Sequence, residues 1–165
     1  MLVPAIAHKV ELVKLFAKEI YSDDYFYYVG YPHWFGIPDF GTESGGEGWN
    51  SDVRWAILDG ETVIGYFAYR IDSICNNVSQ FGLYSFDRGN PIIGIDIFRK
   101  LEELVRRFHR IEWRVVEGNP VIRHYDRFCE RHRGQKVVLH DVIKGLNGEY
   151  LDEYLYEIVN AEERL

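Results

Sequence analysis

The fold is decided by the run from Phe81 to Leu101, which reads Phe-Gly-Leu-Tyr-Ser-Phe-Asp-Arg-Gly-Asn-Pro-Ile-Ile-Gly-Ile-Asp-Ile-Phe-Arg-Lys-Leu. Its first part belongs to a strand pattern over residues 79–86, and residues 87–91 interrupt that pattern with polar residues, a glycine and a proline. Apolar residues then keep helical spacing from Ile93 to Phe108. The run therefore predicts a strand, a glycine-containing loop and a long helix in direct succession.

Helix signals recur on both sides of this run. Near the N-terminus, an amphipathic helix is indicated by apolar residues at three- and four-residue spacing, namely Ile6, Val10, Val13, Ala17 and Ile20. Later in the chain, Asn119 supplies an N-cap, Pro120 suits the first helical position, and Gly134 suits the end of the same helix. We therefore expect three helices, one before the run, one inside it and one after it.

Strand patterns occur in several of the segments between and after these helices. Alternation begins at Val53, and Asp59-Gly60 provides a turn signal between the first two strands. Near the C-terminus, Asn147-Gly148 predicts a two-residue hairpin turn. In chain order we expect a helix over 6–20, strands over 53–58, 63–71 and 79–86, a helix over 93–108, a strand over 111–115, a helix over 119–134, and strands over 137–143 and 150–159.

Composition limits the function classes that fit. A chain of 165 residues has the length of one domain, and 47% hydrophobic residues with 27% charged residues indicate a folded protein. The formal charge of −7 argues against general binding to nucleic acid or a membrane surface. Two cysteines without metal or redox spacing, and no apolar run of membrane-spanning length, lead us to expect a cytoplasmic protein without a metal site.

The order of expected elements and the quoted run resemble the GNAT superfamily of N-acetyltransferases. The resemblance covers residues 53–159 and implies an α/β (α+β) fold with a central mixed, mostly antiparallel sheet flanked by helices. It also implies one domain over residues 1–165, in which residues 53–159 form the acyl-CoA-binding core and residues 1–52 line the acceptor site. The family's activity is acetyl transfer from acetyl-CoA to an amine, which can belong to a small molecule, a protein or a peptide.

Residues of the quoted loop are the first candidates for binding acetyl-CoA. In the family, backbone amides at this helix start hold the pyrophosphate, and glycines let the backbone approach the phosphates. Here Pro91 removes one amide donor, which departs from the family pattern. By resemblance, the cofactor-binding residues in this run are Tyr84, Ser85, Phe86, Arg88, Gly89, Asn90, Gly94 and Ile95.

The segment after the fourth strand supplies the catalytic candidates. Asn119 and Phe128 resemble cofactor-contacting residues, and Tyr125 resembles the family tyrosine that protonates the departing thiolate. A phenol with an ordinary pKa near 10 is protonated at neutral pH and can fill that role. Tyr125 also lies on the helix's apolar stripe, so a purely structural core role stays open. For the general base, Glu117 and Asp72 are the candidates.

The acceptor is expected against the aromatic and glycine-rich segment before residue 53. Tyr31, His33 and Trp34 are the candidate acceptor-binding residues, and a homodimer is compatible with the fold. Two other readings stay open. One is a GNAT-shaped binding or regulatory module without catalysis, and the other is a nucleic-acid surface built from arginines, namely Arg106, Arg107, Arg110, Arg123, Arg127, Arg131 and Arg133.

Overall fold

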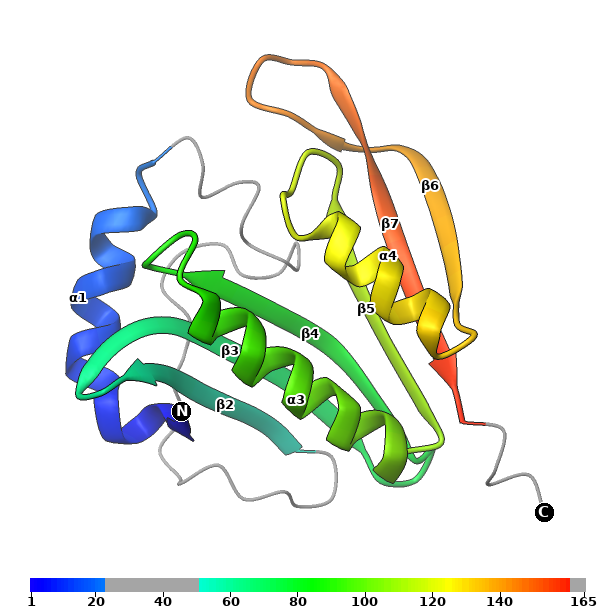
Figure 1. Ribbon diagram of the computed structural model, residues 1–165. Helices are drawn as coiled ribbons and strands as arrows, with labels where there is room; N and C mark the ends of the chain where they lie inside the picture. Colours follow the sequence, from blue (N-terminus) through cyan, green and yellow to red (C-terminus); the bar gives the residue numbers. More distant parts are fainter. Residues whose placement is uncertain (23–50, 161–165) are drawn as a thin grey trace.

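The computed structural model describes residues 1–22 and 51–160 of the chain. These residues form a seven-stranded sheet with the order β1-β2-β3-β4-β5-β7-β6 (Figure 1). Neighbouring strands are antiparallel except β4 and β5, which run parallel. The strands are β1 Leu2–Pro4, β2 Ser51–Asp59, β3 Thr62–Asp72, β4 Asn77–Ser85, β5 Arg110–Val116, β6 Gln135–Lys144 and β7 Tyr150–Val159.

Helices cover both faces of this sheet. Helix α1, Lys9–Glu19, follows the short 3-10 helix η1, Ala5–His8, whereas α3, Pro91–Arg107, and α4, Ile122–Arg131, come later in the chain. Figure 1 shows α3 and α4 in front of the sheet and α1 to one side of them. The predicted fold class, a mixed and mostly antiparallel sheet flanked by helices, is therefore confirmed.

Two apolar clusters hold these layers together. The larger one packs α3 and α4 onto the sheet through residues such as Ile97, Trp113 and Phe128. The smaller one packs α1 onto the opposite face, where Phe16 contacts the rings of Tyr66 and Tyr84. Because successive residues of a strand point to opposite faces, β3 and β4 contribute to both clusters.

A β-bulge in β4 opens the sheet between its two parallel strands. Gln80 has φ +51°, and the pairing registers on both sides of β4 shift around it. Since the extra residue reverses the alternation, Val78 and Phe81 both pack in the larger cluster. The recorded β4–β5 pairing ends at Phe81 opposite Trp113, so the remaining halves of the two strands separate.

The structure corrects three details of the sequence prediction. The buried face of α1 carries Leu12 and Phe16, whereas Val10 is 70% exposed. The prediction therefore placed the buried face of this helix at the wrong rotation about the helix axis. β1 was not predicted, because three residues are too few to show alternation. The β6–β7 turn is one residue longer than predicted, since the amide of Gly145 donates to the carbonyl of Glu149 around three loop residues, 146–148.

The end of α4 is a fourth correction. The left-handed residue after the helix is Arg133, with φ +54°, rather than Gly134. The Arg133 amide donates to the Glu130 carbonyl, and the Gly134 amide donates to the Cys129 carbonyl, which together form a Schellman motif. Gly134 is required for a different reason, because a Cβ there would lie 2.5 Å from the Glu157 carbonyl oxygen.

The predicted division at residue 53 stays a prediction, although β1 joins the same sheet as β2. No helix within residues 1–22 and 51–160 is long and apolar enough to cross a membrane.

Candidate functional site

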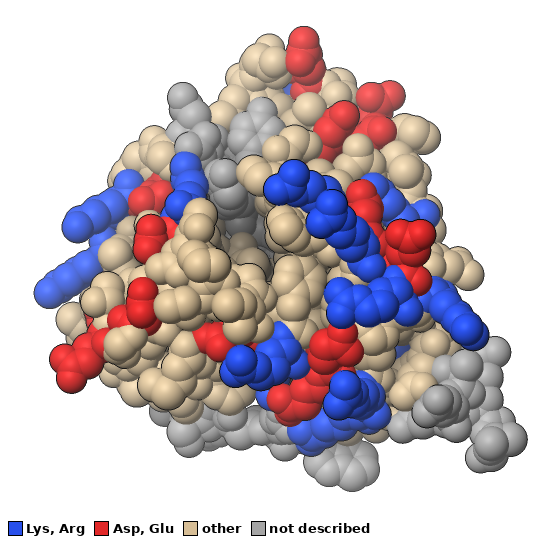
Figure 2. Space-filling view, viewed as in Figure 1, with Lys and Arg blue, Asp and Glu red and all other residues tan. Residues whose placement is uncertain are grey.

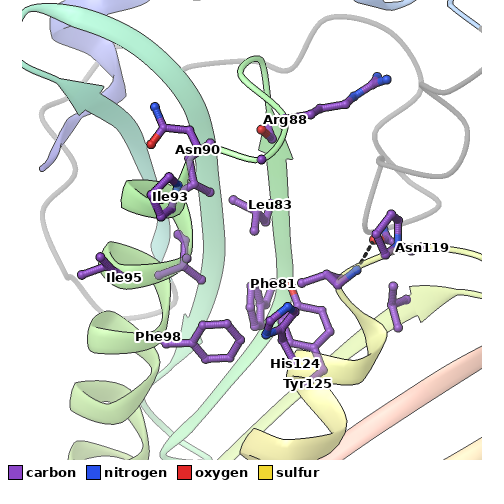
Figure 3. A pocket seen from close by; sticks show the side chains of 18 of the residues that line it. Phe81, Leu83, Arg88, Asn90, Ile93, Ile95, Phe98, Asn119, His124 and Tyr125 are labelled. Carbon is purple, nitrogen blue, oxygen red and sulfur yellow. Dashed lines mark hydrogen bonds between the residues drawn. The ribbon is translucent and has the colours of Figure 1, made fainter.

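A cavity of about 900 Å³ lies between α3 and α4 above the separated halves of β4 and β5. We call it the α3–α4 cavity. Its floor is made by alternate residues of β4, namely Phe81, Leu83 and Ser85, together with Val115 of β5. Figure 3 shows α3 on one side, α4 on the other and β4 between them. The bulge at Gln80 sets which β4 side chains face this cavity.

The N-terminus of α3 forms one end of the cavity. Asn90 is the N-cap, and its side-chain oxygen accepts a hydrogen bond from the Ile92 amide at 3.0 Å. The Asn90 carbonyl accepts the Ile93 amide at 3.3 Å, and Pro91 has no amide hydrogen. The protein itself therefore uses two first-turn donors that an anion could otherwise take, while the helix dipole still favours negative charge there.

Two glycines at this end leave open space. A Cβ added at Gly89 or Gly94 would meet no atom within 4 Å, so internal packing does not explain either residue. Gly89 needs its freedom for the turn, since its φ is +91°. Gly94 lies inside α3, where glycine costs about 1 kcal/mol relative to alanine. A ligand that approaches the backbone closely would account for that cost.

Ser85 adds an unpaired polar atom to the floor of the cavity. Its Oγ is buried and has no hydrogen-bond partner within the described part of the chain. A buried hydroxyl without a partner costs free energy, so a site that leaves one open is suited to a polar ligand.

The charged side chains that line the cavity are all basic. They are Arg88, Arg114 and Arg131, with His124 also present in the lining, and no Asp or Glu belongs to the described lining. Figure 2 shows a hollow in this face, with Lys and Arg side chains gathered over α4 beside it. Although the whole chain is acidic, this face is therefore suited to an anionic ligand.

The start of α4 forms the other wall. The Asn119 side-chain oxygen accepts the Val121 amide at 3.0 Å, but α4 begins at Ile122 with Val121 as its N-cap. Asn119 therefore caps the turn before the helix, and the predicted helix start at Asn119 and Pro120 was wrong. Tyr125 is 4% exposed and lines the cavity (Figure 3). Its ring packs edge-on against Phe81 and Trp113, and burial raises the pKa of its hydroxyl. Tyr125 is thus both a core aromatic and a protonated group at the cavity.

Most of the predicted cofactor residues meet at this cavity. Its lining contains eight of the candidate cofactor-binding and catalytic residues, namely Ser85, Arg88, Gly89, Asn90, Gly94, Ile95, Asn119 and Tyr125. Their predicted roles stay predictions.

The side chains of three candidate cofactor-binding residues lie outside the lining. The side chains of Tyr84 and Phe86 pack with Phe16 on the opposite face of the sheet, because they alternate with Leu83 and Ser85. Phe128 is fully buried in the larger cluster and is not part of the lining.

The two candidate bases are also outside the lining. Glu117 is exposed, and its carboxylate accepts the Asp152 amide at 3.2 Å. Asp72 lies at the β3–β4 turn, where the amide of Cys75, and then that of Ile74, lower the pKa of its carboxyl. That turn is at the end of β4 remote from Ser85. The acceptor candidates Tyr31, His33 and Trp34 lie outside the described residues.

Several lining residues were not candidate site residues in the sequence prediction. Phe81 and Leu83 follow from the alternation that includes Ser85, so the strand pattern carried that signal. Phe98, His124 and Arg114 did not stand out, because each comes from a different element and only the fold brings them together.

The structure resembles solved acetyltransferases. A probable acetyltransferase of the GNAT family from Chromobacterium violaceum matches with a TM-score of 0.63 at 15% identity, covering 100% of this chain and 88% of that one. The spermidine/spermine N-acetyltransferase SpeG from Vibrio cholerae, solved with manganese ions, matches with a TM-score of 0.55 at 20% identity, covering 69% and 68%.

A further candidate acetyltransferase matches with a TM-score of 0.50 at 22% identity, and the match covers 68% of this chain but only 61% of that chain's length. No protein-family model matches the sequence, and no curated protein sequence does. The likeness therefore rests on three-dimensional structure: this chain has the fold of the GNAT-family acetyltransferases.

Proposed function

We propose that the protein is an N-acyltransferase that moves an acetyl group from acetyl-CoA directly to an amine. The observation that carries this proposal is the α3–α4 cavity, which joins the N-terminus of α3 and the neighbouring Arg88 to an apolar cleft between separated strands. CoA has the matching polarity, since its phosphates are anionic and its pantetheine arm is long and narrow.

The residues present fit this cosubstrate. Arg88 and the start of α3 would hold the phosphates, and the open positions at Gly89 and Gly94 leave room for them. The unpaired Ser85 Oγ and the strand edges of β4 and β5 would hydrogen-bond the amides of the pantetheine arm. Phe81, Leu83 and Phe98 would exclude water from it.

Acetyl-CoA would supply an activated acyl group as a thioester. Transfer forms a bond from the amine nitrogen to the acyl carbon, breaks the bond from that carbon to sulfur, and requires a proton for the sulfur. Tyr125 is the candidate donor because it lines the cavity and its phenol carries a proton at neutral pH, as an ordinary phenol does. The amine must itself give up a proton, directly or through water.

The acceptor belongs to the class of amines, from a small molecule, a protein or a peptide. An overall charge of −7 favours a cationic acceptor. Polyamines belong in the first screen, because one structural neighbour is a spermidine/spermine acetyltransferase.

Thermal melting with and without acetyl-CoA tests the proposal. A ligand that binds the native state raises the melting temperature, and a ligand at 100 times its Kd adds about 2.7 kcal/mol of stability. No rise at millimolar acetyl-CoA contradicts the proposal. If the melting temperature rises, a second assay follows. Release of free thiol from acetyl-CoA in the presence of polyamines, aminoglycosides, amino acids or peptides shows whether transfer takes place.

A GNAT-shaped binding module without catalysis is the second candidate. It is favoured by the α3 N-terminus, where Asn90 occupies the Ile92 and Ile93 amides and Pro91 offers none. Such a module gives no thiol release with any amine, whether or not CoA raises its melting temperature.

A further inference from the structure

Three side chains join the C-terminal end of α1 to the loop before α3. The Tyr84 hydroxyl donates to Oε2 of Glu19 at 2.8 Å, and Nη2 of Arg88 lies 3.6 Å from the same oxygen. Residue 19 is 65 positions from Tyr84 in the sequence, so only the fold creates this contact. Burial, followed by the contact with Glu19, raises the pKa of the Tyr84 hydroxyl.

Arg88 therefore lies between the α3–α4 cavity and the C-terminal end of α1. It belongs to the lining of the α3–α4 cavity, but its guanidinium pairs with a carboxylate that packs on the α1 side. Figure 3 shows the Arg88 side chain extending from the loop away from α3. Its charge is thus directed away from the helix N-terminus that would receive the phosphates.

The pair that holds Arg88 is only partly buried. The Glu19 and Arg88 side chains are 30% and 37% exposed, and ion pairs with such access to water contribute little stability. A guanidinium can bind a phosphate through two parallel hydrogen bonds, whereas Arg88 Nη2 lies 3.6 Å from Glu19 Oε2, which is long for a hydrogen bond. An anion at the start of α3 can therefore compete with Glu19 for Arg88.

We propose that Glu19 is an internal competitor for Arg88: it holds the guanidinium while the cavity is empty and releases it when the phosphates of CoA arrive. This inference rests on the proposed function, because it requires a phosphate-bearing ligand in the α3–α4 cavity. Its consequence is that Glu19 weakens CoA binding, although it supports the loop through Tyr84. A residue that only positioned Arg88 for the ligand would strengthen CoA binding.

The direction in which one substitution changes CoA affinity separates these two roles. In Glu19→Gln the side-chain oxygen can still accept the Tyr84 hydroxyl, but the negative charge that holds Arg88 is removed. We expect Glu19→Gln to bind CoA about twofold to fivefold more tightly by isothermal titration calorimetry, the size that a partly exposed ion pair allows. Glu11→Gln makes the same charge change on the same helix, distant from Arg88, and should leave the affinity unchanged.

A double-mutant cycle assigns the effect to Arg88. Arg88→Gln should weaken CoA binding, and adding Glu19→Gln to it should no longer tighten binding, because the competed group is gone. Inorganic pyrophosphate, titrated in the same way, should show the same pattern if the phosphates are the competing groups. Glu19→Ala provides a second variant, and far-ultraviolet circular dichroism checks that each variant is folded.

Unchanged or weaker CoA binding in folded Glu19→Gln and Glu19→Ala overturns the inference but leaves the proposed function standing. Equal tightening in the Arg88→Gln background also overturns it, because the effect would then be general electrostatics. Absence of CoA binding to the unmodified protein is a different result, which removes both the proposed function and this inference.

Discussion

Tyr125 is the residue at which a core role and a catalytic role meet. Its ring fills space between Phe81, Phe98 and Trp113, and it belongs to the cavity lining as well. The ring contacts explain why the residue is aromatic. They do not require the hydroxyl, so the hydroxyl is the part that a functional test should remove.

Tyr125→Phe should lower kcat by about a hundredfold, the typical contribution of a general acid, while the KM for acetyl-CoA stays nearly constant. Phenylalanine keeps the ring packing, so the melting temperature should change little. Steady-state kinetics and thermal melting measure both quantities. An unchanged kcat would show that Tyr125 has only a structural role in the core.

Packing within the described part of the chain does not explain why residue 94 is a glycine, since a Cβ there would meet no atom within 4 Å. Gly94→Ala should raise the free energy of unfolding by about 0.5–1 kcal/mol, because alanine favours the helix. The same methyl should weaken CoA binding by roughly tenfold, or about 1.4 kcal/mol, since it occupies space next to the phosphates. Chemical denaturation and calorimetry are the measurements, and equal CoA affinity in the two proteins would contradict the assignment of this end of the cavity.

At the scale of elements, the junction from α4 to β6 shows how one helix is fixed against the sheet. Arg133 takes the left-handed conformation, and Gly134 brings the backbone against β7. From sequence alone the glycine was assigned to the left-handed position, because glycine is the usual residue there. The structure separates the two requirements onto neighbouring residues.

Gly134→Ala and Arg133→Gly should therefore act in opposite directions. The alanine Cβ would lie 2.7 Å from Cys129 Sγ and 2.5 Å from the Glu157 carbonyl oxygen, so Gly134→Ala should destabilise by about 2–4 kcal/mol. Arg133→Gly relieves a left-handed non-glycine residue and should stabilise by about 1 kcal/mol. Urea denaturation of both variants measures the two changes in the free energy of unfolding. An unchanged free energy of unfolding in Gly134→Ala would show that β7 can move away from residue 134.

Asp126 connects three elements and makes the stability of the whole molecule depend on pH. Its Oδ1 accepts bonds from Lys136 Nζ and from the Tyr156 hydroxyl, both at 2.7 Å. Burial pushes the pKa of this carboxyl upward, but the bonds from Lys136 and Tyr156 outweigh burial and lower the pKa below its ordinary value of 3.8. The folded protein therefore binds this proton less readily than the unfolded chain.

A lowered folded pKa stabilises the protein above the unfolded pKa, and that stabilisation is lost as pH falls through the folded pKa. Asp126→Asn should reduce stability at neutral pH and should flatten the fall in melting temperature between about pH 5 and pH 2. Melting curves of both proteins across that range test whether the pH dependence of the melting temperature becomes weaker in Asp126→Asn. Parallel curves for the two proteins would show that other carboxyls dominate.

The order of helices and strands could be read from the sequence, because each element from β2 to β7 repeats apolar residues with its own period. Asn90 and Asn119 both accept a nearby backbone amide, Asn90 at the start of α3 and Asn119 in the turn before α4. A cap was predicted at Asn119, whereas Asn90 was named only as a cofactor-binding residue by resemblance. The face of α1 was misjudged because Val10 and Leu12 both fit an apolar stripe, and only the sheet decides which one is buried.

The sequence by itself determined the class of fold and most of the loop that faces the cavity, since these depend on local periodicity and turn chemistry. The tertiary structure decided which β4 side chains enter the cavity, because the bulge at Gln80 reverses their alternation. It also decided the contacts that join distant segments, such as Glu19 with Arg88 and Glu102 of α3 with Arg131 of α4. Their partners are set by how the layers pack, and no periodic pattern along the chain encodes that packing.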